Sequence, residues 1–321
     1  MSKVQVIFGG ARVNPGRGFD NAGALQEIFP TLGFYGVHQI DTARVYGQSE
    51  RILGKAKAPS RFLIDTTMPG GLQPGSLARV REQLETSLSE MQTVKVNTML
   101  CGHVNPNITW MGANRVHKQH QVNVCYIHAP DRGFPVENAL WSLNQCRKAD
   151  LFSRINGYVM PEVYEGNYNV FARQQEEELI PRLRRLGISF YAYSPISGSF
   201  LAKSVSQILG GKSGRFVPGS DYWNMYVNHT NVAALKDWGD IAAEDLYSSA
   251  ELAYRWTLFN SALKGEHGDR MIIGSHGVPQ LVQTLQWLQR GPLDSVTCEK
   301  IDRLWDTIKN EVQAPLDVAH G

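Results

Sequence analysis

Short apolar runs rich in β-branched residues alternate along the chain with longer amphipathic segments. Runs of this kind predict buried strands, and their alternation with helical segments is typical of βα units that build a parallel sheet. The pattern predicts seven strands, which cover Val4–Gly10, Gly36–Asp41, Phe62–Thr66, Val122–His128, Tyr158–Glu165, Ile188–Ser194 and Arg270–Ser275. The chain is therefore expected to have an α/β fold.

The segments between these strands repeat their apolar residues at spacings of three and four, which predicts helices. One helix is expected to align Leu77, Val80, Leu84, Leu88 and Met91 on one face. Another should end at Gly187, because glycine readily takes the left-handed conformation that closes a helix. The expected helices cover Phe171–Leu186, Asp245–Leu263, Pro279–Gln289 and Cys298–Asn310, and the last should pack across the wall of the sheet.

The composition is that of a globular protein. Of 321 residues, 42% are hydrophobic and 19% charged, and the net charge of +2 comes from scattered side chains. These values predict one domain over residues 1–321 and argue against a nucleic-acid partner. With no signal-peptide pattern and no apolar run of about 18 residues, we expect a cytoplasmic protein with no membrane partner. The four cysteines form no CxxC pair and the histidines lack metal-ligand spacing, so neither disulfides nor a metal is expected.

Two fragments place reactive side chains at the ends of predicted strands. Asp41–Glu50 (DTARVYGQSE) carries the carboxylate of Asp41 and the phenol of Tyr46, and Tyr126–Asp131 (YIHAPD) carries the imidazole of His128. In a parallel barrel the carboxyl ends of the strands converge on one mouth. An acid, a phenol and an imidazole at this mouth can protonate a carbonyl oxygen that receives hydride.

These fragments, with Tyr193–Gly198 (YSPISG) and Ile272–Ser275 (IIGS) followed by Gln280, resemble the aldo-keto reductase family. The stretch Tyr158–Asn169 is similar to its aflatoxin-aldehyde reductase branch, as are two shorter segments, Arg173-Gln174 and Gly214–Phe216. The resemblance implies a (β/α)8 TIM-type barrel that reduces an aldehyde or ketone with NADPH. It also implies that the partner is a small-molecule carbonyl substrate, and it leaves the oligomeric state open.

The resemblance also implies a role for each matching residue. Tyr46 would protonate the carbonyl oxygen, Asp41 would belong to the same acid–base unit, and His128 would orient the carbonyl. Tyr226 is a further candidate for substrate contact. The expected cofactor contacts are Asp41, Glu165, Tyr193, Ser194, Pro195, Ile196, Gly198, Arg215, Gly274, Ser275, His276, Gln280 and Thr284.

Physical reasons support several of these contacts. Tyr193 can lie flat against a nicotinamide, and the small residues after it allow a close approach to a pyrophosphate. Arg215 matches the phosphate-binding arginine of the family. From Gly274 the chain leads into a helix near Gln280, whose backbone N–H groups suit a 2′-phosphate.

Four features depart from the family pattern. The family has a lysine that lowers the pKa of the tyrosine, and Thr67 occupies that position. Glu165 replaces a glutamine, which changes the contact with a carboxamide because an ionised carboxylate cannot donate. His276 and Thr284 replace serine and asparagine. The Ser-Asn pair that binds the nicotinamide carboxamide is not found.

Two segments near the middle of the chain also depart from the pattern. Seven expected strands are one fewer than a (β/α)8 barrel needs. The expected helix Val136–Arg154 leads directly to the strand Tyr158–Glu165, which the family pattern counts as the sixth, so a fifth βα unit is expected to be missing. The irregular segment 94–120 precedes the strand of His128 and has no place in the family pattern. It is either a lid or translated intron sequence. We favour the second interpretation, because the flanking segments match the family when it is removed.

The function expected from these features is NADPH-dependent carbonyl reduction in a secondary-metabolite pathway such as polyketide or terpenoid biosynthesis. The pathway is an analogy with fungal reductases. The alternative is a catalytically impaired pseudoenzyme or an NADPH-binding partner subunit. Thr67 and the missing Ser-Asn pair favour that alternative, whereas Asp41, Tyr46 and His128 favour an enzyme.

Overall fold

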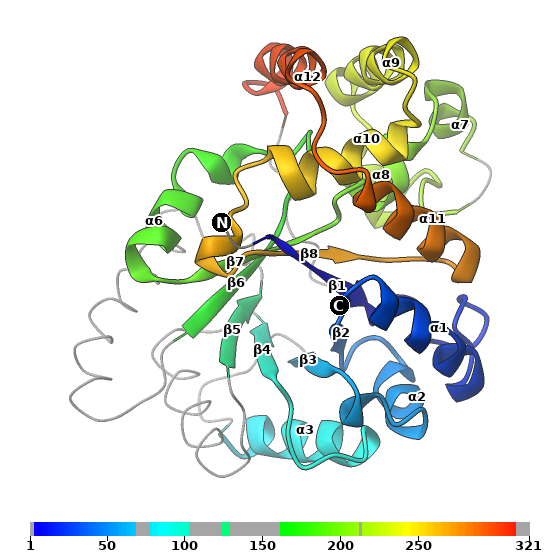
Figure 1. The fold of residues 1–321 in the computed structure, drawn as a ribbon, viewed down its shortest axis with the longest axis vertical. Helices are drawn as coiled ribbons and strands as arrows, with labels where there is room; N and C mark the ends of the chain where they lie inside the picture. Colours follow the sequence, from blue (N-terminus) through cyan, green and yellow to red (C-terminus); the bar gives the residue numbers. More distant parts are fainter. Residues whose placement is uncertain (1–2, 69–76, 103–123, 129–160, 212–213, 313–321) are drawn as a thin grey trace.

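Eight parallel strands close into a barrel in this computed structural model, which describes residues 3–68, 77–102, 124–128, 161–211 and 214–312 (Figure 1). Each strand pairs with the next along the chain, and the eighth returns to the first. The α/β class and the parallel sheet are confirmed. The strands are β1 Gln5–Gly9, β2 Gln39–Ala43, β3 Leu63–Met68, β4 Thr98–Gly102, β5 Val124–His128, β6 Pro161–Asn167, β7 Ser189–Tyr193 and β8 Arg270–Ile273.

The expected count of seven strands is wrong. β4 lies inside the segment 94–120 that the sequence pattern assigned to an irregular insert, and it pairs with both β3 and β5. The five residues of β4 end in Gly102 and are followed by Asn, His and Pro, so the sequence pattern resembled a loop. A fifth strand is thus present, and His128 ends the fifth strand rather than the fourth. Residues 103–120 and the expected helix over 136–154 lie outside the described residues.

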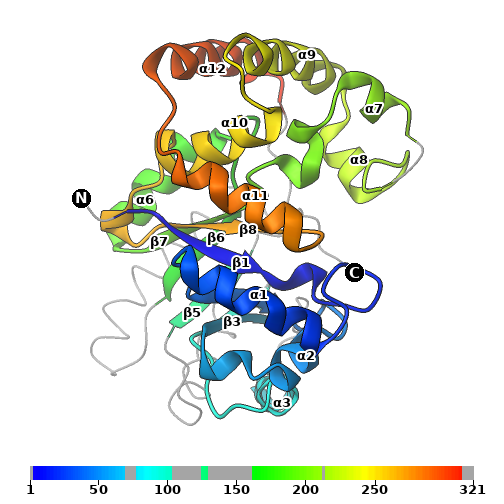
Figure 2. The same ribbon diagram turned by 45° about the vertical axis from the view of Figure 1, so that its right-hand side comes forward.

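Helices lie around the outside of the barrel (Figures 1 and 2). The α-helices of the described residues are α1 Ala22–Phe34, α2 Ser49–Lys55, α3 Leu77–Glu90, α6 Leu179–Leu186, α7 Val205–Leu209, α8 Asp221–Tyr226, α9 His229–Glu244, α10 Ser249–Arg255, α11 Val278–Gln289 and α12 Ser295–Ile308. Short 3-10 helices cover Gly10–Arg12, Ala58–Ser60, Gln174–Glu176, Ser197–Ala202 and Gly265–His267, and a π-helical turn covers Trp256–Asn260.

Two expected helices begin later than the sequence pattern predicts. The helix expected from Phe171 begins only at Leu179, because the Asn169 side chain accepts a hydrogen bond from the Phe171 amide at 3.0 Å and holds a turn there. The helix expected from Asp245 begins at Ser249, after the Ser248 hydroxyl accepts from the amide of the third helical residue. Asp245 instead ends α9, which the sequence pattern did not predict.

Helix α12 packs on α9 rather than directly on the strands, and both views place the two helices side by side (Figures 1 and 2). Lys300 of α12 contacts Asp245 at 2.7 Å and Glu244 at 3.1 Å. Arg173 joins α12 to the segment before α6, since its guanidinium pairs with Asp302 at 2.8 Å and lies over the Trp305 ring. Helix α12 is therefore bound to α9 and to the segment before α6.

The barrel has a small apolar interior above a polar floor. Ile7, Val163, Tyr191 and Ile272 form a buried cluster inside the barrel, whereas the larger core lies between strands and helices. At the floor, Asp65 accepts hydrogen bonds from Gln39 and from Asn97, and Gln39 accepts one from Arg270. Buried polar groups need such partners, and these contacts tie β2, β3 and β8 together.

Gly187 tests the backbone constraint at the end of α6. Its φ of 69° is left-handed, and a Cβ added there would meet no atom within 4 Å, so Gly187→Ala should cost only the backbone strain of about 1–2 kcal/mol. Gly33 in α1 also has open space but lacks a positive φ, so Gly33→Ala should stabilise by up to about 1 kcal/mol. Urea unfolding measures both. Equal effects of the same sign in the two variants would contradict the left-handed conformation assigned to Gly187.

Candidate active site

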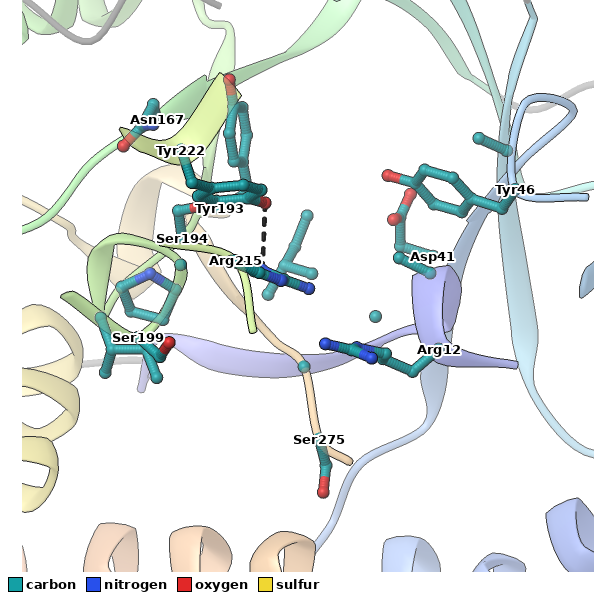
Figure 3. A pocket seen from close by; sticks show the side chains of 18 of the residues that line it. Arg12, Asp41, Tyr46, Asn167, Tyr193, Ser194, Ser199, Arg215, Tyr222 and Ser275 are labelled. Atoms are coloured by element: carbon teal, nitrogen blue, oxygen red, sulfur yellow. Dashed lines mark hydrogen bonds between the residues drawn. The ribbon is translucent and has the colours of Figure 1, made fainter. Parts of the chain in front are cut away.

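One pocket opens at the carboxyl ends of the strands and encloses about 230 Å³ (Figure 3). Its lining comes from the strands, from the segments that follow them, and from α8, α10 and α11. The residues are Gly9, Ala11, Arg12, Asp41, Ala43, Val45, Tyr46, Thr67, Glu165, Asn167, Tyr193, Ser194, Pro195, Ile196, Gly198, Ser199, Arg215, Asp221, Tyr222, Met225, Tyr254, Ile272, Gly274, Ser275, His276 and Gln280. Most of the residues predicted from the sequence therefore come together here.

The loop after β2 holds Tyr46 in place. The Asn14 side chain donates a hydrogen bond to the Tyr46 carbonyl oxygen at 2.6 Å and accepts one from the Gln48 amide at 2.8 Å. Gly47 has a φ of 62°, and a Cβ there would lie 2.7 Å from the Asn14 oxygen. This turn thus requires glycine, and it directs the phenol of Tyr46 toward Asp41 (Figure 3).

Ser49 and Glu50, which follow Tyr46 in the sequence, attach this loop to the barrel. The Ser49 hydroxyl donates to the Gly10 carbonyl oxygen at 3.0 Å and lies 2.7 Å from the Thr42 hydroxyl. Glu50 is buried, and its carboxylate accepts from Arg44 at 2.8 Å and from Thr66 at 2.7 Å. Ser49 and Glu50 therefore have structural roles that fix β1, β2 and β3 around the pocket.

Carboxylates dominate the arm of the pocket that contains Tyr46. Asp41 is 5% exposed and Glu165 is 4% exposed. Burial raises the pKa of Asp41 well above its ordinary value, and Glu165 and then Asp65 raise it further. Burial also raises the pKa of the Tyr46 phenol, with additional contributions from Asp41 and Glu165. The phenol is therefore held firmly in its protonated form.

Thr67 contributes no charge to this arm. It is 7% exposed, lines the pocket, and pairs with Ala43 of β2. A lysine at this position would place an ammonium near Asp41 and would lower the pKa of both the carboxyl and the phenol. Burial and then the neighbouring carboxylates raise the pKa values of Asp41 and Tyr46, and the neutral Thr67 does not oppose these effects.

The opposite arm is basic, and Figure 3 shows the guanidinium groups of Arg12 and Arg215 turned toward the same space. Arg215 donates to the Tyr222 hydroxyl at 3.0 Å, and its guanidinium carbon lies 4.7 Å from the centre of the Tyr222 ring. Arg12 Nη2 lies 3.0 Å from His276 Nε2. Since a guanidinium only donates, His276 must accept there, and burial together with the two arginines lowers the pKa of His276. His276 is therefore neutral.

Sequence reasoning missed Arg12 and Tyr222. Arg12 belongs to the short helix after β1, whose side-chain direction no strand pattern predicts. Tyr222 comes from α8, and its ring lies against the turn after β7: a Cβ on Gly198 would stand 2.1 Å from the ring. Tyr222 and Tyr226 are spaced to lie on one face of a helix, and this spacing could have identified Tyr222 from the sequence.

The turn after β7 is conformationally unusual. Ser194, Ser197 and Ser199 have φ values of 55°, 52° and 89°, and Gly198 has 66°. Three non-glycine residues in the left-handed region store strain, which is found most often at ligand-binding turns. Ser194, Gly198 and Ser199 all line the pocket.

Three residues that the sequence predicts for the site are not part of the described pocket lining. Tyr226 is buried behind the pocket wall, where its hydroxyl accepts from Asn167 Nδ2 at 2.8 Å, and burial raises its pKa. Thr284 is buried on α11 and forms a hydrogen bond with Tyr254. His128 is placed only by its backbone, which pairs with Glu165 at the end of β5.

The donor set of this pocket fits a nicotinamide dinucleotide. Arg12, Arg215 and Ser275 supply cationic and hydroxyl donors suited to phosphate oxygens. The N-terminus of α11 follows, and its N-cap Gly277 has no side-chain cap. Gly274 has no neighbour within 4 Å of an added Cβ and leaves the backbone accessible. At the other arm, Tyr193 lines the pocket, and Glu165 can accept from an amide.

Comparison with known proteins places the chain in a family. The model of the aldo/keto reductase family matches residues 5–111 and 113–306, and the chain belongs to this family. The chain is 32% identical to human aldo-keto reductase family 7 member A3 over 85% of this chain and 86% of that protein. It is 31% identical to human aflatoxin B1 aldehyde reductase member 2, over 85% of this chain and 79% of that protein. Oxidoreductase sirO of Leptosphaeria maculans is 29% identical over 96% of this chain and 91% of that protein.

These comparisons confirm the resemblance stated from the motifs, including the similarity to aflatoxin aldehyde reductases. The family match also runs through most of segment 94–120, so the expected insert is not confirmed. Among the described residues, no helix is long and apolar enough to cross a membrane. The same part of the chain contains no group of three His, Cys, Asp or Glu side chains that could hold a metal ion.

The raised pKa of Asp41 predicts how stability depends on pH. The folded protein holds the Asp41 proton more tightly than the unfolded chain does, so its contribution to stability is present below the unfolded pKa near 3.8 and is lost as pH rises through the folded pKa. Asp41→Asn removes this titration. Thr67→Lys supplies a counter-ion that lowers the folded pKa. Urea unfolding from about pH 4 to pH 8 should therefore show a smaller loss of stability in both variants than in the natural protein.

Parallel curves for all three proteins would contradict the raised pKa. Arg185→Ala, at an exposed position on α6, controls for a general change of net charge. It should leave the slope of the natural protein unchanged.

Proposed function

We propose that this protein reduces an aldehyde or ketone with NADPH. The observation that carries the proposal is the polarity of one pocket: Asp41 and Tyr46 line one arm, and Arg12 and Arg215 line the other. Such a pocket suits a dinucleotide whose phosphates meet the arginines while its nicotinamide end meets the phenol. Family membership supports the same chemistry, since aldo-keto reductases generally use a nicotinamide cofactor.

In the proposed reaction the bound cofactor supplies hydride to the carbonyl carbon. The carbonyl oxygen then gains negative charge and must be protonated. Tyr46 carries the available phenolic proton, since burial and the neighbouring carboxylates keep it protonated. Asp41 lies beside it and, because burial raises its own pKa, can hold the proton that Tyr46 recovers. His128, at the end of β5, is proposed to orient the carbonyl.

The preference for NADPH over NADH is proposed from the basic arm. Arg215, Ser275, His276 and Gln280 surround the entry to α11, a helix of 12 residues. Helix N-termini bind phosphate through free N–H groups, and guanidinium groups strengthen such binding. NADH lacks the 2′-phosphate that would use these donors.

A secondary-metabolite pathway is proposed for this reduction, in a cytoplasmic single-domain protein. Fungal relatives support it: sirO, already described, and the aldo-keto reductase pigE of Monascus ruber, which is 24% identical over 89% of this chain. The names of the aflatoxin B1 aldehyde reductases give an aldehyde as their substrate.

A second candidate function is that of an impaired enzyme or an NADPH-binding subunit. Thr67 favours it, because the Tyr46 phenol lies among carboxylates and its pKa is raised. A phenol of this kind is a poor acid at neutral pH. The two candidates differ in turnover and agree in cofactor binding.

Arg215 tests the cofactor preference. Arg215→Ala should weaken NADPH binding by about 10-fold or more, because a hydrogen bond from a charged donor contributes about 1.5–3 kcal/mol, and it should leave NADH binding less affected. Fluorescence titration measures both nucleotides. Arg185→Ala removes an equal charge from the exposed face of α6 and should change neither affinity. Equal affinities of the natural protein for both nucleotides would remove the argument from the 2′-phosphate.

Tyr46 tests the proton donor. Tyr46→Phe removes the hydroxyl and keeps the ring, so reduction of benzaldehyde should fall by about 10²–10⁴-fold, as expected for loss of general acid catalysis. NADPH binding, measured by fluorescence, should persist because the basic arm is unchanged. Aldehyde reduction at the natural rate in this variant would mean that another group donates the proton. NADPH binding without turnover in the natural protein would favour the impaired enzyme.

A further inference from the structure

We propose that Tyr222 is a positioning residue for cofactor binding, which holds the Arg215 guanidinium in place for a phosphate group of the dinucleotide. Arg215 lies on the segment before α8, and Tyr222 is the second residue of that helix. Both side chains line the pocket. This inference rests on the proposed function, because it concerns how the same pocket binds its cofactor.

The guanidinium of Arg215 contacts Tyr222 in two ways. Its Nη1 donates a hydrogen bond to the phenolic oxygen at 3.0 Å (Figure 3). Its central carbon lies 4.7 Å from the centre of the same ring, within the range of a cation–π contact. The hydrogen bond fixes one nitrogen and the ring contact fixes the carbon, so Tyr222 restricts both the position and the direction of the guanidinium.

The backbone of Arg215 is held by the same helix. The Ser220 hydroxyl, which caps α8, donates to the Arg215 carbonyl oxygen at 2.6 Å and accepts from the Trp223 amide at 3.2 Å. Helix α8 and its cap therefore contact the arginine at both ends, through Ser220 at the backbone and through Tyr222 at the guanidinium.

The Tyr222 ring is itself fixed by its surroundings. It lies so close to Gly198 that an added Cβ there would stand 2.1 Å from a ring carbon. The ring stacks with Tyr226 at a centroid distance of 6.4 Å, and it forms a T-shaped contact with Phe216 at 6.2 Å. Tyr226 and Phe216 are both buried, so the ring of Tyr222 rests on the protein core. Through Gly198 it also contacts the turn after β7.

Two effects act against a fixed orientation of Arg215, and the contacts with Tyr222 oppose both. Burial, and then Arg215, lowers the pKa of Arg12, because the two guanidinium groups repel each other. A flexible arginine also loses side-chain freedom when it binds a phosphate, and contacts that order it beforehand reduce this cost. Tyr222 supplies that order before the cofactor binds.

Tyr222→Phe tests this role, because it removes the phenolic oxygen and keeps the ring. NADPH affinity is measured by fluorescence titration in the natural protein, in Tyr222→Phe, in Arg215→Ala and in the double variant. Tyr222→Phe alone should weaken NADPH binding by about 3- to 10-fold, the cost of immobilising one long side chain. In the Arg215→Ala background the same substitution should have no further effect, because the hydroxyl acts through the arginine.

Tyr247→Phe is the matched control. Tyr247 also has a guanidinium over its ring, with the Arg255 carbon 5.0 Å from the ring centre, and it lies outside the lining of the pocket. Its replacement by phenylalanine should leave NADPH affinity unchanged. Circular dichroism and urea unfolding confirm that each variant folds.

The results separate this inference from the proposed function. Unchanged NADPH binding in Tyr222→Phe, with the expected loss in Arg215→Ala, would overturn the positioning role and leave the proposed function intact. An equal loss from Tyr222→Phe with and without Arg215 would also overturn it, because the hydroxyl would then contact the cofactor itself. Absence of NADPH binding by the natural protein would overturn the proposed function and the inference together.

Discussion

The parallel pairing of β1 with β8 is the constraint on which the pocket depends. Four residue pairs, from Gln5 with Arg270 to Phe8 with Ile273, close the sheet. Closure brings the segment after β1 beside the segment after β8, which is why Arg12 meets His276 across 264 positions of sequence. Without it the basic arm and the acidic arm would not face each other.

Charge separation within this closed mouth explains the proposed chemistry. The arginines lie where phosphates are expected, and the carboxylates lie around the phenol of Tyr46. Burial and then Arg12 lower the pKa of His276, and burial and then Glu165 raise the pKa of Asp41. The phosphates of the proposed dinucleotide would place negative charge beside the arginines and would relieve the repulsion in the basic arm.

Much of the barrel follows from sequence alone because buried parallel strands are continuous apolar runs. All seven expected strands exist, and Gly187 ends α6 as predicted. β4 was missed because five residues that end in glycine resemble a loop. Asp41, Tyr46 and Glu165 could be placed at one mouth because strand ends converge. Arg12 and Tyr222 could not be placed there from the sequence. They belong to a turn and a short helix, and contacts between distant segments set the direction of their side chains.

The proposed function requires hydride transfer in this pocket from a bound nicotinamide directly to a substrate carbon. Mass spectrometry of the product tests it most directly. The protein is incubated with benzaldehyde and NADPH that carries two deuterium atoms at the nicotinamide C4 position. We predict benzyl alcohol with one deuterium atom on the carbon that was the carbonyl. Alcohol without deuterium, or no alcohol although NADPH binds, would contradict direct hydride transfer in this pocket.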